Sequence, residues 1–354
     1  MFFIVLAILS ALLFGAATPI SKVLLASLTP FQLAGLLYLG AAAVLLPVLI
    51  AKRCLRPIGR LDRANRIRFL GAILLGGICG PLALLFGLQM AAAASVAMWL
   101  NLELVATALL GHFLFRDYLG RYGWLASGGA LAASALLLWD GGGAGVGAGL
   151  LVGLACICWG FDNHFTALID GITPSASTFC KGLVAGSVNL AIGMSIAPYE
   201  AGAGITGQAL MVGGLSYGAS IVLYISAAQH IGATRGQIFF SSAPFWGVGL
   251  SVFFLGEPFS MLQICAAILL IVAMVLLMSE GHKHSHEHAP NAHEHWHRHG
   301  DGHHDHEHEK KPGWLGHSHL HSHEQLRHAH SHWPDLHHRH LHHRHLHHRH
   351  AQKE

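Results

Sequence analysis

Long apolar runs fill the first 278 residues and restrict the folds that the chain can adopt. A helix needs about 20 apolar residues to cross a hydrocarbon layer about 30 Å thick, and ten successive runs come close to this length. We expect helices near residues 3–25, 31–51, 68–89, 93–115, 121–139, 149–169, 175–197, 208–228, 236–255 and 260–278. The sequence therefore predicts an all-α integral membrane protein with ten transmembrane helices.

Charge is scarce in this part of the chain and frequent after it. Hydrophobic residues make up 53% of the 354 residues and charged residues only 11%, about half the share found in soluble proteins. Of the 31 histidines, 28 lie after residue 278. These values indicate a membrane body, residues 1–278, followed by a polar His-rich tail, residues 279–354. No phosphate-binding loop, nucleophile elbow or zinc-protease motif occurs, so the sequence gives no support for an enzyme.

Basic residues gather in the connections after the second, fourth and eighth runs. Ten of them share one side of the membrane when the N-terminus is inside, and Lys22 alone approaches the other side. The positive-inside rule then places the N-terminus in the cytoplasm, and ten crossings return the C-terminus to the same side. We expect a multi-pass protein of a bacterial inner membrane, surrounded by lipid. A homodimer is a candidate assembly, and no feature suggests a nucleic-acid partner.

The fourth run returns in altered form as the ninth. Trp99–Gly120 corresponds to Phe239–Pro258, an alignment that sets Asn101 against Ser241 and Glu103 against Ala243. The first and sixth runs are related in the same way. Two long apolar segments with matching ends suggest that the chain is built twice.

Five helices per copy is an odd number, so the second copy inserts upside down relative to the first. Inverted repeats of this kind place a substrate site near the midplane, between the halves. The sequence predicts five-helix repeats over residues 1–139 and 149–278, joined by a Gly-rich linker over residues 140–148.

The motifs and their order resemble the drug/metabolite transporter superfamily, EamA-type. The motifs that carry the resemblance are Phe14-Gly15, Pro19, Lys22, Thr29-Pro30, Phe115-Arg116-Asp117, Trp159-Gly160, Thr173-Pro174, Ser242-Ala243-Pro244 and Gly256-Glu257-Pro258. The resemblance covers residues 1–278 and implies ten helices in duplicated halves, and export of amino acids, metabolites or drugs. Two positions depart from the pattern: Leu104 replaces the usual proline of the fourth helix, and His164 stands where Pro19 stands in the first copy.

An acidic residue, Glu103, lies in the middle of the fourth run. A carboxyl group there usually faces a cavity or a partner, so Glu103 is the first candidate for a proton or cation site. The alternative is a buried structural carboxyl. Asp162 and Lys181, in the sixth and seventh runs, lie about equally deep, so we expect an ion pair that is either structural or part of a gate. The other candidate pathway residues are Asn101, Trp99, Trp159, His164 and Tyr217.

Histidine alternates with other residues through most of the tail. Alternation places every second imidazole on one side of an extended chain, and neutral imidazole is a good ligand for nickel, cobalt, zinc and copper ions. With few apolar residues the tail cannot form a core, so we predict a disordered tract that binds divalent transition-metal ions, while the body needs no cofactor. The candidate ligands are His282, His284, His286, His288, His293, His295, His297, His299, His303, His304, His306 and His308.

Three functions fit these patterns. The first is an exporter of nickel, cobalt or zinc whose tail captures the ion and whose Glu103 releases a proton when the cation binds. The second is an exporter of amino acids or small metabolites with a metal-buffering tail, which the aromatic residues and the usual cargo of the family favour. The third, a membrane-tethered metal sensor, is weakest because an anchor needs no acid at the midplane. Glu103, Asp162 and His164 favour the first, so we predict metal export.

Overall fold

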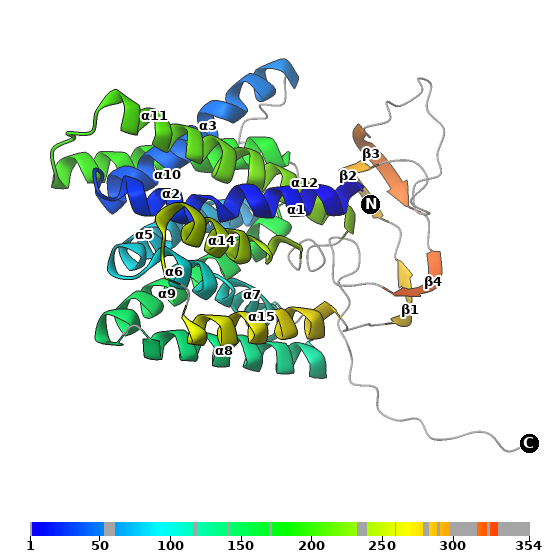
Figure 1. Ribbon diagram of the computed structural model, residues 1–354. Coiled ribbons are helices and arrows are strands. Elements are labelled where there is room, and N and C mark those ends of the chain that lie inside the picture. Colours follow the sequence, from blue (N-terminus) through cyan, green and yellow to red (C-terminus); the bar gives the residue numbers. More distant parts are fainter. Residues whose placement is uncertain are drawn as a thin grey trace, which may run out of the picture.

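The chain folds into a bundle of helices, followed by short strands in the tail (Figure 1). This computed structural model describes residues 2–52, 61–115, 119–140, 142–169, 172–231, 239–258 and 260–278, and in the tail residues 283–288, 291–297, 317–323 and 326–331. Within the described body, ten helical segments follow one another in the predicted order.

The first half contains five of these segments, three of them interrupted. They are α1 (Phe2–Gly15) continued by α2 (Ala17–Leu24); α3 (Pro30–Lys52); α4 (Arg63–Gly71), η2 (Ala72–Cys79) and α5 (Gly80–Met90); α6 (Ala93–Trp99) and α7 (Leu102–Phe113); and α8 (Arg121–Asp140).

The second half also contains five segments, of which the third is interrupted in the same way as in the first half. Its segments are α9 (Gly142–Ala167); α10 (Pro174–Ile196); α11 (Ala203–Val212), η3 (Gly213–Ala219) and α12 (Ser220–Ile231); α14 (Ala243–Leu255); and α15 (Met261–Met278).

Four segment starts differ from the sequence prediction by five residues or more; α11 begins at Ala203 rather than near residue 208, and α14 at Ala243 rather than near residue 236. The third segment begins at Arg63 rather than near residue 68, because the Asp62 side chain accepts a hydrogen bond from the Asn65 backbone N–H and caps the helix. In the second half, α9 begins at Gly142, so helix runs through most of the predicted linker at residues 140–148. Glycine weakens a helix, but backbone groups near the hydrocarbon layer must pair with one another, and a helix provides that pairing.

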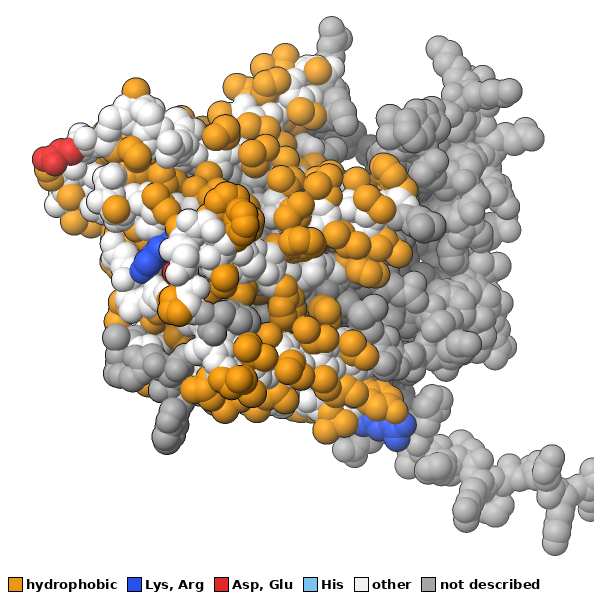
Figure 2. All heavy atoms as spheres, in the orientation of Figure 1, with side chains coloured by type: hydrophobic (Ala, Val, Ile, Leu, Met, Phe, Trp, Pro, Cys, Tyr) orange, Lys and Arg blue, Asp and Glu red, His pale blue; other side chains and the backbone are white. Residues whose placement is uncertain are grey.

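The surface confirms the predicted membrane class. Seven helices in the described part of the chain are long and apolar enough to cross a membrane, and two shorter ones, Ala243–Leu255 and Met261–Leu276, are also apolar. Figure 2 shows hydrophobic side chains over most of one face of the bundle, with very few charges among them. The body is therefore a multi-pass integral membrane protein.

Two π-helical segments, η2 and η3, occupy the same place in the two halves, in the third helix of each. Each contains a pair of adjacent glycines, which lets neighbouring backbones approach. Glycine has the same role in α10, where a Cβ on Gly182 would lie 2.7 Å from the carbonyl oxygen of Tyr38 in α3. Small residues therefore bring the helices of the two halves into close contact.

The described part of the tail forms two antiparallel strand pairs, which differs from the predicted disorder. They are β1 (Lys283–His288) with β4 (Leu326–Ser331), and β2 (Asn291–His297) with β3 (His317–His323). Histidines stand opposite one another in the register at His284–His330, His286–His328, His293–His321, His295–His319 and His297–His317. An alternating sequence has the period of a strand, and pairing of two strands satisfies their backbone N–H and C=O groups. Figure 1 shows these strands at the same end of the bundle as the start of α1.

Candidate functional site

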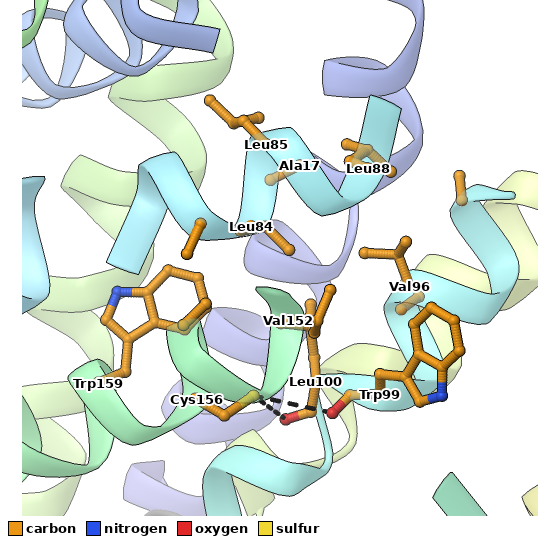
Figure 3. Packing of buried hydrophobic residues seen from close by; sticks show 14 of the residues in the cluster. Ala17, Leu84, Leu85, Leu88, Val96, Trp99, Leu100, Val152, Cys156 and Trp159 are labelled. Atoms are coloured by element: carbon orange, nitrogen blue, oxygen red, sulfur yellow. Dashed lines mark hydrogen bonds between the residues drawn. The ribbon is translucent and has the colours of Figure 1, made fainter. Parts of the chain in front are cut away.

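The fourth helical segment is broken between α6 and α7, at Leu100 and Asn101. Hydrogen bonds from Asn101 N to Met98 O (3.1 Å) and from Glu103 N to Leu100 O (3.0 Å) close tight turns here. Cys156 of α9 contributes a weak S–H donor to the carbonyl oxygens of Trp99 (3.7 Å) and Leu100 (3.9 Å), as Figure 3 shows. The break is thus supported by a neighbouring helix.

A small cavity of about 20 Å³ lies beside this break, between the two halves. Residues of α1–α2, of the α6–α7 break and of the start of α14 line it together. They are Phe14, Gly15, Thr18, Leu100, Asn101, Glu103, Leu104, Phe240, Ser241, Ala243 and Pro244. This volume holds a water molecule or a bare ion but no larger solute. Asn101 and Ser241, which correspond to one another in the internal sequence repeat, therefore line the same cavity.

Glu103 is buried in the first turn of α7, facing this cavity. The positive end of the α7 dipole stabilises a carboxylate in the first turn, typically by 0.3–1 kcal/mol. Asn163 of α9 donates a hydrogen bond from Nδ2 to Glu103 Oε1 at 2.9 Å. The carboxyl group therefore combines a helix terminus, an amide donor and a cavity.

A chain of polar contacts extends from Asn163 along α7 and α9. The same Asn163 Nδ2 also donates to Thr107 Oγ1 at 3.2 Å. His164 Nε2 donates to the backbone oxygen of Thr107 at 2.9 Å, and its ring stacks on Phe115 with centroids 4.2 Å apart. His164 thus packs in the wall between α7 and α9 and does not line the cavity.

The expected ion pair between Asp162 and Lys181 is confirmed. Lys181 Nζ donates to Asp162 Oδ2 at 2.7 Å and to Oδ1 at 3.0 Å, and both residues are buried. Thr166 Oγ1 donates to Asp162 Oδ1 as well. A Cβ on Gly76 would overlap the Asp162 carboxylate, so this glycine makes room for the pair.

The π-helix η2 supplies the backbone acceptors next to this pair. The carbonyl oxygen of Gly76 accepts hydrogen bonds from Tyr38 Oη (2.6 Å) and Trp159 Nε1 (3.1 Å). Asn189 Nδ2 donates to the oxygen of Gly77 at 3.3 Å. Side chains of three helices thus bind the backbone of η2. Single π-helical turns within α-helices are often found at functional sites.

Aromatic rings form a buried cluster around Phe14, which itself lines the cavity. Its ring centroid lies 5.1 Å from that of Phe240, 5.5 Å from Tyr217 and 6.3 Å from Trp159. Tyr217 also packs on Tyr38 at 5.4 Å. Of the aromatic candidates, Trp159 and Tyr217 therefore belong to a wall beside the cavity.

Trp99 lies elsewhere. Its indole Nε1 donates to the backbone oxygen of Ser134 at 3.3 Å, and the ring is fully buried in the apolar core, pointing away from Trp159 in Figure 3. We therefore assign Trp99 to packing.

The tail candidates fall into two groups. Six of the predicted ligands are strand positions, three in β1 (His284, His286, His288) and three in β2 (His293, His295, His297). His282, His299, His303, His304, His306 and His308 lie outside the described residues. Among the residues that the structure describes, no group of three or more His, Cys, Asp or Glu side chains could hold a metal ion.

Sequence reasoning missed Cys156, Asn163 and Tyr38 as residues of the site. Cys156 resembled an ordinary small apolar residue, and spacing alone does not tell which helix face meets which neighbour. The sequence offered one signal for two of them: Cys156 lies six residues before Asp162, and Asn163 directly follows it.

Comparisons with known proteins agree with this arrangement. The chain is 24% identical over 302 residues to an uncharacterized transporter of Methanothermobacter thermautotrophicus, covering 77% of this chain and 85% of the relative. It shares the fold of a protein solved by crystallography, with a TM-score of 0.57 and 16% identity over 77% of this chain and 96% of the other. A model of the EamA-like transporter family matches twice, over residues 1–139 and 147–279. Since these matches span both halves of the body, the chain belongs to the EamA-like transporter family.

Proposed function

We propose that this transporter is an exporter that couples cargo movement to proton exchange at Glu103. The observation that carries the proposal is the position of Glu103, buried in the first turn of α7 and facing the cavity between the two halves. A carboxyl group in a membrane is stable when protonated or when it binds a cation. Release of the proton on one side and rebinding on the other would link proton flow to cargo.

For the cargo we place a small organic solute first. Asp162 is held by Lys181, and His164 is held by a backbone oxygen, so two of the three side chains that favoured a metal in the sequence have other partners. Aromatic rings stand beside the cavity instead. The cavity of about 20 Å³ must widen in another conformation to admit such a solute.

The second candidate cargo is a divalent transition-metal ion, nickel, cobalt or zinc. The opposed histidine positions in the two strand pairs of the tail favour this candidate, because imidazole groups on neighbouring strands can share one ion. Inside the body the ion would meet oxygen ligands, from Glu103, Asn101 and Ser241.

We also propose ten crossings, with both termini in the cytoplasm of a bacterial cell and the body in its inner membrane. The support comes from the basic residues of the connections and from the common end of the bundle at which the start of α1 and the tail strands lie (Figure 1).

The test of the proton site is Glu103→Gln, which keeps the size and the acceptor for Asn163 but removes the ionisable group. We expect normal insertion and loss of most proton-driven transport in membrane vesicles. Glu200→Gln is the matched control, because Glu200 is exposed in the connection after α10. Wild-type transport by Glu103→Gln at equal membrane abundance would remove Glu103 from the mechanism.

The cargo is tested separately, with cells that have or lack the protein. Growth in excess amino acids and toxic amines, and in excess nickel, cobalt, zinc and copper, tells the two classes apart. Protection confined to metal ions would reverse our order of the two cargo classes.

A further inference from the structure

A lysine and a glutamate hold the turn between α5 and α6 from two sides. Lys22, near the end of α2, donates from Nζ to the carbonyl oxygens of Leu88 (2.6 Å) and Ala91 (2.9 Å) at the end of α5. These are carbonyl groups that a helix leaves unpaired at its negative end. The positive charge of Lys22 therefore matches the terminus that it binds.

Glu257, just after α14, makes the complementary contact. Its Oε1 accepts from the backbone N–H of Ala93 and its Oε2 from that of Ala94, both at 2.8 Å, at the start of α6. A carboxylate at a helix N-terminus meets unpaired N–H groups and the positive end of the dipole. Such charge-assisted hydrogen bonds are roughly twice as strong as neutral ones.

Three of the four helices joined by these contacts, α2, α6 and α14, also reach the cavity. Thr18 of α2, Leu100 directly after α6, and Ala243 at the start of α14 all border it. Between the cavity and the two charged contacts, the helices touch at glycines: a Cβ on Gly247 would lie 3.0 Å from the oxygen of Gly15 and 3.1 Å from Ala97 Cβ. Toward Lys22 and Glu257, the cavity is therefore covered first by the close contact of Gly247 with Gly15 and Ala97, and then by the two charged contacts.

This end of the bundle is opposite the start of α1 and the tail strands. Lys22 lies near the end of the segment Phe2–Leu24, and therefore far from the start of α1. Gln32, at the start of α3, donates a hydrogen bond to the backbone oxygen of Ala197, so the connection that contains Glu200 lies at this end as well. With the termini in the cytoplasm, it is the outer end.

We propose that Lys22 and Glu257 are the outer gate of the transporter. They hold the α5–α6 turn against α2 and α14 while the cavity is closed to the outside, and they release it when cargo leaves. The proposal rests on the proposed exporter function, because a gate has a role only in transport. Opening of the gate can be measured without any cargo, as access of a reagent to the cavity.

The experiment measures access to Thr18→Cys in a chain whose six native cysteines are replaced by serine. A membrane-impermeant maleimide is applied to the outer face, which Glu200→Cys identifies. Glu257→Gln and Lys22→Met each weaken one contact, and we expect labelling of Thr18→Cys to become about tenfold faster, as for a closed state weakened by about 1.4 kcal/mol. Glu257→Asp and Lys22→Arg should label more slowly than these two variants, because they keep the charge.

Arg68→Met is the matched control. Arg68 caps the oxygen of Leu168 at 2.9 Å in the same manner, but at the opposite end of the third helical segment. It should leave outer labelling unchanged. A purely structural role predicts lower unfolding temperatures for Glu257→Gln and Lys22→Met with unchanged labelling, and that result would overturn the gate.

Failure of the gate and failure of the proton site give different results. If Glu103→Gln transports normally while the Lys22 and Glu257 variants label faster, the gate stands and the proton site fails. If labelling does not change while Glu103→Gln loses transport, the gate alone fails.

Discussion

At the scale of single residues, the stability of the body depends most clearly on the ion pair between Asp162 and Lys181. Both are buried, and each neutralises the charge of the other at 2.7 Å. Removing one partner of a buried pair leaves the other charge unpaired, at a typical cost of about 3–5 kcal/mol, whereas removing both is often neutral.

We therefore expect Asp162→Asn to unfold at a clearly lower temperature in detergent than the wild type. The double variant Asp162→Asn with Lys181→Met should recover most of that loss. A structural pair predicts that the double variant also transports normally, and a gate predicts that it folds but does not transport. Thermal unfolding and vesicle transport of the three proteins answer both questions; equal stability of Asp162→Asn and wild type would contradict the pairing argument.

This pair was predictable from sequence because it needs only depth in neighbouring helices. Asp162 and Lys181 lie about equally far from a short connection, and that is enough to pair them. The hydrogen bond between Asn163 and Glu103 was not predictable, because it depends on how α9 is rotated against α7, which sequence spacing does not specify.

At the scale of elements, apolar length predicted where helices lie but not how they are interrupted. The α6–α7 break is stabilised by Cys156 of α9, and η2 by hydrogen bonds from Tyr38 and Trp159. Irregular backbone inside a membrane protein is tolerated only where other groups satisfy it, so these interruptions are set by tertiary contacts. They occur where the cavity and the ion pair lie.

Gly76→Ala tests whether η2 and the ion pair depend on one another. The added Cβ would overlap the Asp162 carboxylate, so the pair must separate or the π-helix must move. We expect lower thermal stability by about 1–3 kcal/mol, the range for overpacked sites, together with impaired transport. Gly128→Ala in α8 is the control, because a Cβ there meets no atom within 4 Å. Similar behaviour of both variants would show that the pair does not need Gly76.

At the scale of the whole molecule, the two halves of the body form the candidate site together. The cavity is formed by elements of both halves, so neither half contains the site alone. The duplicated pattern in the sequence predicted this arrangement, since it set Asn101 against Ser241, and both line the cavity. The strand pairing of the tail was not predicted, because residues 291–297 and 317–323 are distant in sequence and contain few apolar residues that could indicate a register.

Deletion of the tail tests the proposed metal binding separately from transport. The described strands pair with one another and not with a helix, so deletion of residues 282–354 should leave the body folded, inserted and as stable to heat as the full chain. If the cargo is an organic solute, the shortened protein should transport it at the wild-type rate and lose only the binding of nickel, cobalt or zinc. If the cargo is a metal ion, the shortened protein should need a higher cytoplasmic concentration of the ion to reach the same rate.

The full chain should release bound metal below about pH 6, because imidazole must be neutral to bind. Calorimetric titration of the full chain and of the chain without residues 282–354, at pH 7.5 and pH 5.5, measures metal binding. Transport by the two proteins is measured in parallel. Equal metal binding by the full and shortened chains at pH 7.5 would contradict the role of the tail as the metal-binding segment.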